Sequence, residues 1–514
     1  MTFDSNAAAY TITMLPGSST SNTYSQILNF YGEGIVNDSG TVQNFVTQGA
    51  PGPESDDPGA IYFMASSAVG RNVVFTNQGS GASETAGGYT RFGLQLADNP
   101  SAGNATFINE GGKVSGTYYG GFTDLVSDST ANAAIFINQP GEVSGAAAGI
   151  TYVYTGGSIG TSTFVNNPAA VPGAEGGWTE IDGAICAGSS FLANGATIAG
   201  AQGGQVYSYG GTGYATFTAS GGQGSGTQGG LLEIHNIADS SETVVVAQGG
   251  TNGGLGGMIT INSRPTTLDQ VQFQVLGNAT MDLTGLSQPS AVIGSLSGQG
   301  TVSLSRRLLD VGSNNMSTSF SGIIQNSGGV SKSGTGTLTL SGANTYKAGT
   351  TINAGALIAS NSSGSATGTG SIAVNGGTLG GGGTIAGAVT VGTGSNSGAI
   401  LQPGFGTNKK VTLTIQGLLT FNADATYNFG LKNKRAEIVA NGVTIASGAQ
   451  FTMTAPNRSL PARKTATVIS NTSTTPISGT FANLPDGGTI TVGNNTFKAN
   501  YEGGDGNDLT LTVQ

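Results

Sequence analysis

The sequence of 514 residues is poor in charged side chains, which make up 9% of it against about 25% in an average globular protein. Disordered chains combine high charge with low hydrophobicity, so the 37% of hydrophobic residues here argues against that class. Acidic residues number 27 and basic residues 17. Because this net negative charge repels a phosphate backbone, we expect no nucleic-acid partner.

The chain has one cysteine and one histidine, which excludes most catalytic and metal chemistry. Cys186 alone cannot form an intramolecular disulfide or a cysteine-rich zinc site. His235 alone excludes a multi-histidine metal centre, and any Ser-His-Asp triad would have to use it. We therefore expect no cofactor and no metal. No apolar run approaches the roughly 18 residues of a membrane helix, so we expect no membrane span.

Glycine, in contrast, is abundant, with 89 residues and no three-residue period that would indicate collagen. The N-terminal half repeats a short phrase built around a phenylalanine, often with an asparagine two residues later. The phenylalanines of this phrase are Phe45, Phe75, Phe107, Phe136, Phe164, Phe191 and Phe217. They recur at intervals of roughly 26 to 32 residues, which is too short for one domain per repeat and indicates stacked units.

Two further phrases follow in each repeat. The first is an apolar residue followed by Ser-Gly, as in 114–116 and 143–145, and the second opens with glycine and then alternates, as in 121–125 and 177–181. Three short segments rich in β-formers, with Gly, Asn and Pro between them, predict three strands and one coil of a parallel β-helix. We predict an all-β fold, a right-handed single-stranded parallel β-helix (β-solenoid) with a β-rich C-terminal segment.

Alternation within the glycine-led phrase assigns its side chains to two faces. The predicted interior contains Phe92, Leu125, Val153, Ile181 and Ile234, together with Thr90, Thr123, Thr151, Thr179 and Val206. The phenylalanine column should stack inside the coil as well. We expect an asparagine ladder beside it, formed by Asn77, Asn109, Asn138 and Asn166, to satisfy backbone groups at a corner.

Residue usage divides the chain into four predicted parts. Residues 1–35 form an N-terminal cap, and residues 36–260 form the β-helix whose coils have the length of the phenylalanine repeat. From about residue 260 Gly, Ser and Thr dominate, so we assign residues 261–410 to a second β-helix region and residues 411–514 to a β-rich C-terminal segment.

The stretch Ser333 to Leu357, SGTGTLTLSGANTYKAGTTINAGAL, closely resembles the autotransporter-associated β-strand repeat, also called the passenger-associated transport repeat. Residues 320–322 and 328–332 fit the lead-in of that family, and residues 501–508 are similar to a segment that often ends such passengers. The resemblance implies an exported β-helix, extracellular or on a bacterial cell surface, frequently an adhesin or coat component. Residues 1–5 lack the features of a signal peptide, so we expect the export signal either to have been removed or to be replaced by another device.

The outward side chains of the glycine-led phrase form the candidate functional surface. One column contains Arg91, Asp124, Tyr152, Glu180, Tyr207 and Glu233, and the next contains Gly93, Val126, Tyr154, Asp182, Tyr209 and His235. Aromatic rings beside carboxylates suit a sugar polymer, which stacks on rings and donates hydroxyl hydrogen bonds. The predicted ligand-binding residues are Tyr152, Tyr154, Trp178, Tyr207 and Tyr209. The plainer interpretation is an ordinary strand surface, since tyrosine packs well against cross-strand neighbours.

An alternative function is a polysaccharide-degrading enzyme on the same face, a glycoside hydrolase in preference to a lyase. Its catalytic residues would be Glu180, Asp182, Glu233 and His235. Two residues apart on one strand, Glu180 and Asp182 would lie roughly 7 Å apart, within the window of about 6.5 to 9.5 Å of inverting glycosidases. We favour a non-catalytic surface or secreted protein, adhesin-like or structural, that contacts glycans, cells or copies of itself, because Lys, Arg and His are scarce.

Overall fold

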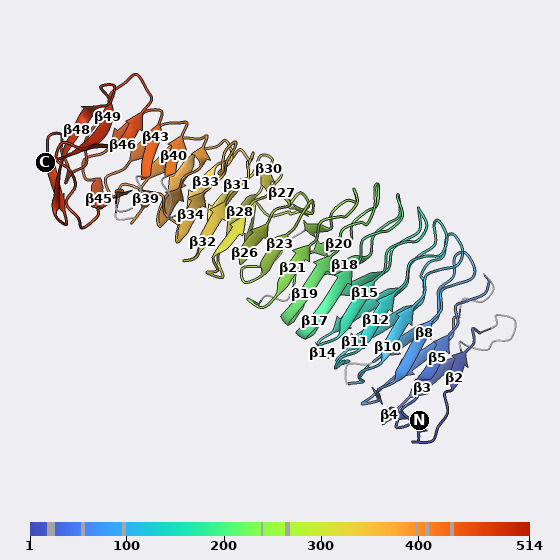
Figure 1. The fold of residues 1–514 in the computed structure, drawn as a ribbon. Coiled ribbons are helices and arrows are strands. Elements are labelled where there is room, and N and C mark those ends of the chain that lie inside the picture. The colour runs from blue at the N-terminus through green and yellow to red at the C-terminus, as the bar shows by residue number, and fades with distance from the viewer. Residues whose placement is uncertain are drawn as a thin grey trace. The chain divides into compact units, whose positions relative to one another are not determined.

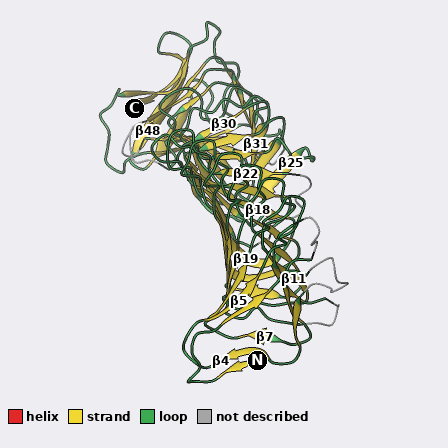
Figure 2. Ribbon diagram, turned by 90° about the vertical axis from the view of Figure 1, so that its right-hand side faces the viewer, coloured by secondary structure: helices red, strands yellow, loops and turns green. Residues whose placement is uncertain are grey.

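The computed structural model describes residues 1–17, 26–52, 57–94, 99–237, 240–262, 268–395, 398–406, 411–431 and 436–514. The described residues form β-strands connected by turns and loops and contain no helix (Figures 1 and 2). Accordingly, none of them belongs to an apolar helix that could cross a membrane. The chain divides into two compact units, Met1–Ser287 (unit 1) and Gln288–Gln514 (unit 2).

Unit 1 is a parallel β-helix whose successive coils add strands to the same walls, running from blue to green in Figure 1. The first wall contains β2 (Thr11–Met14), β5 (Gln43–Thr47), β8 (Val73–Asn77), β10 (Thr106–Asn109), β12 (Ile135–Asn138), β15 (Thr163–Asn166), β17 (Ile185–Ala193), β19 (Thr212–Ala219), β21 (Val244–Ala247) and β23 (Gln272–Val275). The second wall contains β3 (Ile27–Phe30), β6 (Ala60–Phe63), β9 (Tyr89–Phe92), β11 (Phe122–Ser127), β13 (Ile150–Thr155), β16 (Trp178–Ile181), β18 (Gln205–Ser208), β20 (Leu231–Ile234), β22 (Met258–Ile261) and β24 (Thr280–Asp282). The predicted parallel β-helix is confirmed.

A third, shorter wall lies between the end of each second-wall strand and the next first-wall strand. Its strands are β1 (Thr2–Phe3), β4 (Gly34–Asn37), β7 (Ala68–Val69) and β14 (Ser158–Gly160), and β14 pairs with the beginning of β17. Between β7 and β14 this wall is reduced to single bridges, which join Ala68 to Ser101 and Ser101 to Thr130. The third strand of the coil therefore exists in places, but not where the sequence placed it.

The apolar-Ser-Gly phrase, which we expected to be a strand, forms a turn. Its glycines have φ near +75° at Gly116 and Gly145, a left-handed conformation that lies outside the extended region of regular strands. The turns still stack, because the backbone N–H of Gly145 donates to the carbonyl of Gly173, 2.8 Å away. The segments 110–120, 139–148, 167–176 and 194–203, which join the first wall to the second and contain these turns, are called the turn arms below.

The phenylalanine column fills the interior of unit 1, as predicted. Neighbouring rings from Phe45 to Phe217 are stacked with centroids 4.6 to 5.2 Å apart. Six of these seven side chains have no exposed surface, and Phe217 is 2% exposed. Each coil thus contributes one ring to a continuous apolar stack, which supplies much of the area removed from water.

The asparagine ladder beside the rings is also confirmed. The side-chain amide of Asn138 donates to the Oδ1 of Asn166 at 2.7 Å and to the backbone carbonyl of Trp178 at 2.8 Å. Its own Oδ1 accepts from the amide of Asn109 at 2.8 Å and from the hydroxyl of Thr151 at 2.9 Å. At Asn109 and Asn138 the ladder therefore ties the end of a first-wall strand to the start of the second-wall strand in the following coil.

Close backbone approach explains the glycine before each second-wall strand. A Cβ on Gly177 would lie 2.1 Å from the carbonyl oxygen of Asn138, and one on Gly149 would lie 1.9 Å from that of Asn109. Neither distance is compatible with a side chain. This contact fixes where the second-wall strand begins, and so it sets the position of Trp178 as the first residue of β16.

Unit 2 continues the parallel arrangement with shorter coils. One wall contains β26 (Ser295–Gly298), β29 (Thr318–Phe320), β32 (Thr337–Leu340), β34 (Ala356–Ala359), β36 (Thr378–Gly381), β39 (Ile400–Pro403), β42 (Thr426–Gly430) and β45 (Gln450–Thr454). Another contains β25 (Ser290–Ile293), β28 (Leu308–Val311), β31 (Gly329–Lys332), β33 (Thr350–Ile352), β35 (Ile372–Val374), β38 (Val389–Val391), β41 (Leu419–Phe421) and β44 (Val443–Ile445). A short pair, β27 (Thr301–Ser303) and β30 (Ile323–Gln325), lies beside them.

The last sheet of unit 2 changes from parallel to antiparallel pairing. Its strands, in spatial order, are β37 (Thr384–Ile385), β40 (Val411–Ile415), β43 (Ala436–Ala440), β46 (Thr465–Asn471), β49 (Asp508–Val513), β48 (Asn495–Gly503) and β47 (Thr489–Val492). The pairs from β46 to β47 are antiparallel. The C-terminal part is thus β-rich. The four domain boundaries themselves stay predictions.

Candidate functional site

The first outward column has the composition that the sequence predicted. Asp124 pairs with Arg91 on one side and Tyr152 on the other. Glu180 pairs with Tyr152 and Tyr207, and Tyr207 pairs with Glu233. Carboxylates and aromatic rings therefore alternate along the second wall, one per coil.

The second column is only partly on strands. Val126 and Tyr154 pair within β11 and β13. Asp182, Tyr209 and His235 each come directly after the end of their strand. Asp182, expected on one strand with Glu180, lies in a bend directly after β16 and is followed by Gly183, with φ of +96°. The predicted spacing between the two carboxylates stays a prediction. The rings of Tyr209 and His235 still stack, with centroids 4.4 Å apart.

A chain of aromatic contacts runs along this wall. The rings in contact are, in order, Tyr62, Tyr89, Phe122, Tyr152, Trp178 and Tyr207. Their centroids are 4.6 to 6.2 Å apart. Tyr154, at 38% exposure, and Tyr209, at 40%, lie beside this chain and are the most accessible of the predicted ligand-binding rings. The wall thus offers rings to solvent over several coils.

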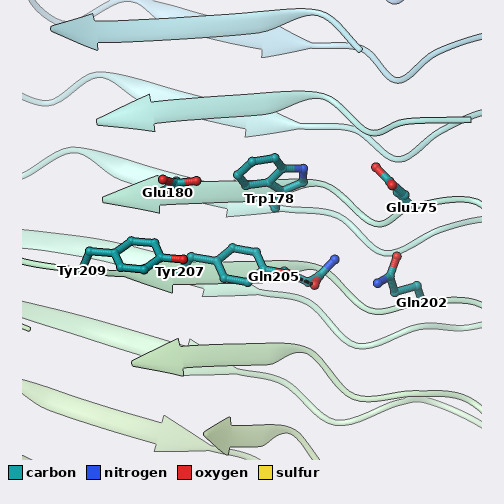
Figure 3. A pocket seen from close by; sticks show the side chains of 7 residues that line it. All are labelled: Glu175, Trp178, Glu180, Gln202, Gln205, Tyr207 and Tyr209. Atoms are coloured by element: carbon teal, nitrogen blue, oxygen red, sulfur yellow. Dashed lines mark hydrogen bonds between the residues drawn. The ribbon is translucent and has the colours of Figure 1, made fainter. Parts of the chain in front are cut away.

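A cavity of about 310 Å³ opens on this wall and is called the acidic cavity below. Its lining residues are Glu175, Trp178, Glu180, Gln202, Gln205, Tyr207 and Tyr209. Figure 3 shows that Trp178 and Tyr207 come from neighbouring strands, whereas Glu175 and Gln202 come from the loops that lead into those strands. These loops are the turn arms. The cavity therefore needs both the second wall and the turn arms.

Hydrogen bonds hold the two amide side chains of the acidic cavity. The Tyr207 hydroxyl donates to the Oε1 of Gln205 at 2.5 Å, and the N–H of Gly176 donates to the Oε1 of Gln202 at 3.1 Å. Within the described residues, neither amide nitrogen has a hydrogen-bond acceptor. Both glutamines therefore keep a donor group for a molecule in the cavity.

The two carboxylates are held in the same way. The N–H of Ala148 donates to the Oε2 of Glu175 at 3.3 Å, and the hydroxyl of Tyr154 donates to the Oε1 of Glu180. The second oxygen of each carboxylate keeps its acceptor capacity. Within the described residues, neither glutamate takes part in an ion pair. Burial, together with the charge of Glu233, raises the pKa of Tyr207 to about 12, so this phenol stays neutral near pH 7.

A second cavity, of about 250 Å³, lies earlier on the same wall and is called the arginine cavity below. Its lining residues are Arg91, Tyr119, Phe122, Asp124, Val126, Tyr152 and Tyr154. The guanidinium of Arg91 lies 2.6 Å from the carboxylate of Asp124, and 5.9 Å and 5.6 Å from the ring centres of Tyr62 and Tyr89. Burial raises the pKa of Asp124, and Arg91 opposes that shift.

The acidic cavity does not bring the residues of the enzymatic alternative together. Of these residues, only Glu180 lines the acidic cavity. Glu233 is 2.8 Å from the Nε2 of His235, in the coil beyond, and Asp182 is exposed. The structure brings Glu175, rather than Asp182 or Glu233, to the same cavity as Glu180. Among the described residues, no group of three or more His, Cys, Asp or Glu side chains could hold a metal ion.

Sequence reasoning missed Glu175, Gln202 and Gln205. Gln205 could have been predicted from the sequence, because it aligns with Trp178 in the repeat. In the structure the two residues pair on neighbouring strands. Glu175 and Gln202 lie on turn arms, and no periodicity marks their side chains as facing the second wall.

Comparison with known proteins identifies a passenger-associated transport repeat at residues 330–359. These residues include strands of two successive coils of unit 2, among them β32, β33 and β34. No curated protein matches the sequence. Among solved structures, the crystal structure of the Haemophilus influenzae Hap adhesin is similar at 11% identity, with a TM-score of 0.28, over 94% of this chain. The chain spans 64% of the length of that adhesin.

The match to the repeat confirms the resemblance found in the sequence. The chain is a parallel β-helix, and it carries the transport repeat at the predicted place. Its location is extracellular or at the cell surface, as expected for such passengers.

Proposed function

Because the chain carries the transport repeat of exported passengers, we propose that it is a non-catalytic, adhesin-like surface protein whose second wall in unit 1 contacts glycans. The observation that carries the proposal is the row of aromatic rings that alternate with carboxylates and open into two cavities. Rings cover the apolar faces of sugars, and the carboxylate and amide groups beside them exchange hydrogen bonds with hydroxyls.

The positions of Asp182 and Glu233, two of the carboxylates predicted for catalysis, support binding over hydrolysis. A glycosidase needs two carboxyl groups on opposite sides of one scissile bond. Glu233 is engaged with His235 and does not line the acidic cavity, and Asp182 lies outside it. Glu180 and Glu175 lie on either side of Trp178, which suits two polar contacts with one ligand (Figure 3).

Retention on insoluble polysaccharides tests the proposal. We expect the purified chain to be retained on at least one of cellulose, chitin, xylan and mannan. Replacing Trp178 and Tyr207 together by alanine should weaken retention at least tenfold, because stacking area is lost. Tyr214→Ala is the control, since Tyr214 is an exposed tyrosine, at 40%, on β19 of the first wall. Equal retention of all three proteins would contradict a glycan contact on the second wall.

Release of reducing ends from the same polysaccharides separates binding from catalysis. We expect no release by the parent chain. Release that disappears in a Glu180→Gln, Glu233→Gln double variant would instead make this face an active site and overturn the non-catalytic assignment.

A second candidate function, self-association, is favoured by the N-terminal end of unit 1. There β1 and β3 are edge strands, and edge strands present unpaired backbone groups to a partner. Ile27 on β3 is 39% exposed and Tyr31 after it is 67% exposed. At the C-terminal end of unit 2, by contrast, the antiparallel strands β49, β48 and β47 follow the last parallel pair.

Sedimentation velocity tests this second candidate. A concentration-dependent increase in sedimentation coefficient for the parent chain, lost in Ile27→Lys, would support association through the edge of β3, because a lysine blocks strand pairing there. Leu255→Lys, at another exposed apolar residue of unit 1, is the control. A parent chain that stays monomeric at all concentrations would exclude it.

A further inference from the structure

We propose that the acidic cavity binds an amino sugar, a glycan residue that carries a protonated amine. This inference rests on the proposed glycan contact and names the class of ligand. Three features of the cavity support it: two carboxylates, three aromatic rings and two amide groups, all from unit 1.

The charge of the cavity favours a cation. Glu175 and Glu180 both line it, and no Lys, Arg or His lines it among the described residues. Each carboxylate is oriented by a donor on one oxygen only. Two negative charges at one cavity repel an anionic sugar such as a uronate, and they attract an ammonium group by charge-assisted hydrogen bonds.

The rings strengthen the same preference. Trp178, Tyr207 and Tyr209 line the cavity, and a cation close to an aromatic face is attracted by the negative charge of that face. The same wall already holds a cation between a ring and a carboxylate. The guanidinium of Arg91 lies 5.6 Å from the ring centre of Tyr89 and is paired with Asp124. In the arginine cavity the chain supplies the cation itself. The acidic cavity also has rings and carboxylates, but none of the described residues that line it is basic.

The amide groups distinguish an amino sugar from a simple organic cation. Gln205 is only 8% exposed, and the Tyr207 hydroxyl fixes its carbonyl oxygen, so its nitrogen is available to donate. The N–H of Gly176 likewise fixes the carbonyl oxygen of the Gln202 side chain, so the nitrogen of that side chain is also available to donate. Donors of this kind match the hydroxyl and ring oxygens of a sugar, whereas a quaternary ammonium group has no acceptor for them.

Three oligosaccharides with the same backbone provide the test: hexamers of β-1,4-linked glucosamine, N-acetylglucosamine and glucose, which carry an ammonium, an acetamido or a hydroxyl group on the same carbon. Calorimetry at a pH below the pKa of the amine should show at least tenfold tighter binding of the glucosamine hexamer. The preference should weaken at high salt and above the amine's pKa, because the attraction is electrostatic.

Matched variants locate the effect. Glu175→Gln with Glu180→Gln keeps the shape of the cavity and should abolish the preference for the amine while keeping the melting temperature. Glu142→Gln, which removes an exposed carboxylate on a turn arm outside the cavity, should preserve it. The linear polyamine spermidine controls for general attraction to a chain of net charge -10 and should bind at least tenfold more weakly than the glucosamine hexamer.

Each other outcome overturns the inference in its own way. Equal affinity for the three hexamers would remove the amine preference and leave the proposed glycan contact standing. If the preference for the amine survives in the double glutamine variant, or if spermidine binds as tightly as the glucosamine hexamer, the amine is not recognised by the acidic cavity. If no hexamer binds, the amino sugar is excluded, and retention on the four polysaccharides still decides the proposed function.

Discussion

The two units use the same parallel stacking but coils of different length. In unit 1, the chain makes one full coil between the paired residues Phe107 and Phe136. In unit 2, it makes a coil between Phe320 and Leu340 and the next between Leu340 and Ala359, and both are shorter. The difference in coil length is close to the length of one turn arm. A β-helix of this kind therefore needs only the short coil to stack, and the added residues of unit 1 are available to build a site.

The cavities follow this difference. The acidic cavity takes Glu175 and Gln202 from the turn arms and its rings from the second wall. Unit 2 also has a cavity, of about 330 Å³, and its lining residues are Thr339, Ile358, Ser360, Gly381, Gly382, Phe405, Gly406 and Val411. No charged side chain of the described residues lines it. The short coil thus forms an uncharged cavity, whereas the long coil forms a cavity with hydrogen-bonded polar side chains.

The interiors differ as well. Unit 1 buries the asparagine ladder and the phenylalanine stack. Unit 2 buries mostly aliphatic side chains, together with Lys332, which is 1% exposed. The chain has one tryptophan, Trp178, in unit 1. Its fluorescence therefore reports the unfolding of unit 1, while circular dichroism reports both units, and this allows substitutions to be compared unit by unit.

The largest effect should come from a charge in the phenylalanine stack. Phe136 is fully buried between Phe107 and Phe164, so Phe136→Asp places an unpaired carboxylate there at a cost of several kcal/mol. We expect the Trp178 transition to fall sharply in temperature, while the part of the dichroism signal from unit 2 persists. Phe136→Leu, the apolar control, should cost far less. An unchanged Trp178 transition would contradict the buried stack.

A smaller but more local effect should follow from Gly177→Ala. The added Cβ meets the Asn138 carbonyl at 2.1 Å, so the backbone must shift, and we expect a loss of about 1 to 3 kcal/mol in the stability of unit 1. The acidic cavity should lose affinity too, because Trp178 follows directly. The control is Gly81→Ala, whose Cβ meets no atom within 4 Å, and this change should be neutral or slightly stabilising. Equal denaturant midpoints for the two variants would show that the close approach does not limit stability.

The parts that could be predicted from the sequence are those that repeat with a constant period. Alternation with period two placed Phe92 inside and Glu180 outside, and the repeat length put Tyr207 between Glu180 and Glu233. The turn arms escaped prediction because an apolar-Ser-Gly phrase has the composition of a strand. Only the left-handed conformation at Gly145 shows that it turns.

Backbone pairing that leaves no periodic pattern of side chains could not be predicted from the sequence either. The third wall of unit 1 is held in part by single bridges, as at Ser101, and these leave no alternating pattern. Glu175 was missed for a related reason, since its contact with the second wall depends on the course of a turn arm. The alignment of Gln205 with Trp178 was available from the repeat itself, and inspection of that column alone would have found it.

The smallest effect concerns the buried lysine of unit 2. The ammonium group of Lys332 donates to the backbone carbonyls of Ser333 and Gly334. Burial lowers the pKa of Lys332 to about 8, and Asp310 opposes the shift. Lys332→Met keeps the length of the side chain but removes the donors, so we expect a loss of about 1 to 3 kcal/mol at pH 7 in the stability of unit 2.

The pH dependence of that loss gives the sharper measurement. Between pH 8 and about 10.4 the unfolded chain holds a proton on Lys332 that the folded chain has released, so the stability of the parent rises with pH through this window. The Lys332→Met variant lacks this gain, and the difference between the two proteins should therefore widen from pH 8 to pH 10. Denaturant unfolding followed by circular dichroism measures it, with the Trp178 transition of unit 1 as the internal reference. A constant difference across these pH values would mean that the three carbonyls near the ammonium group, those of Ser333, Gly334 and Ala354, hold its proton as firmly as water does.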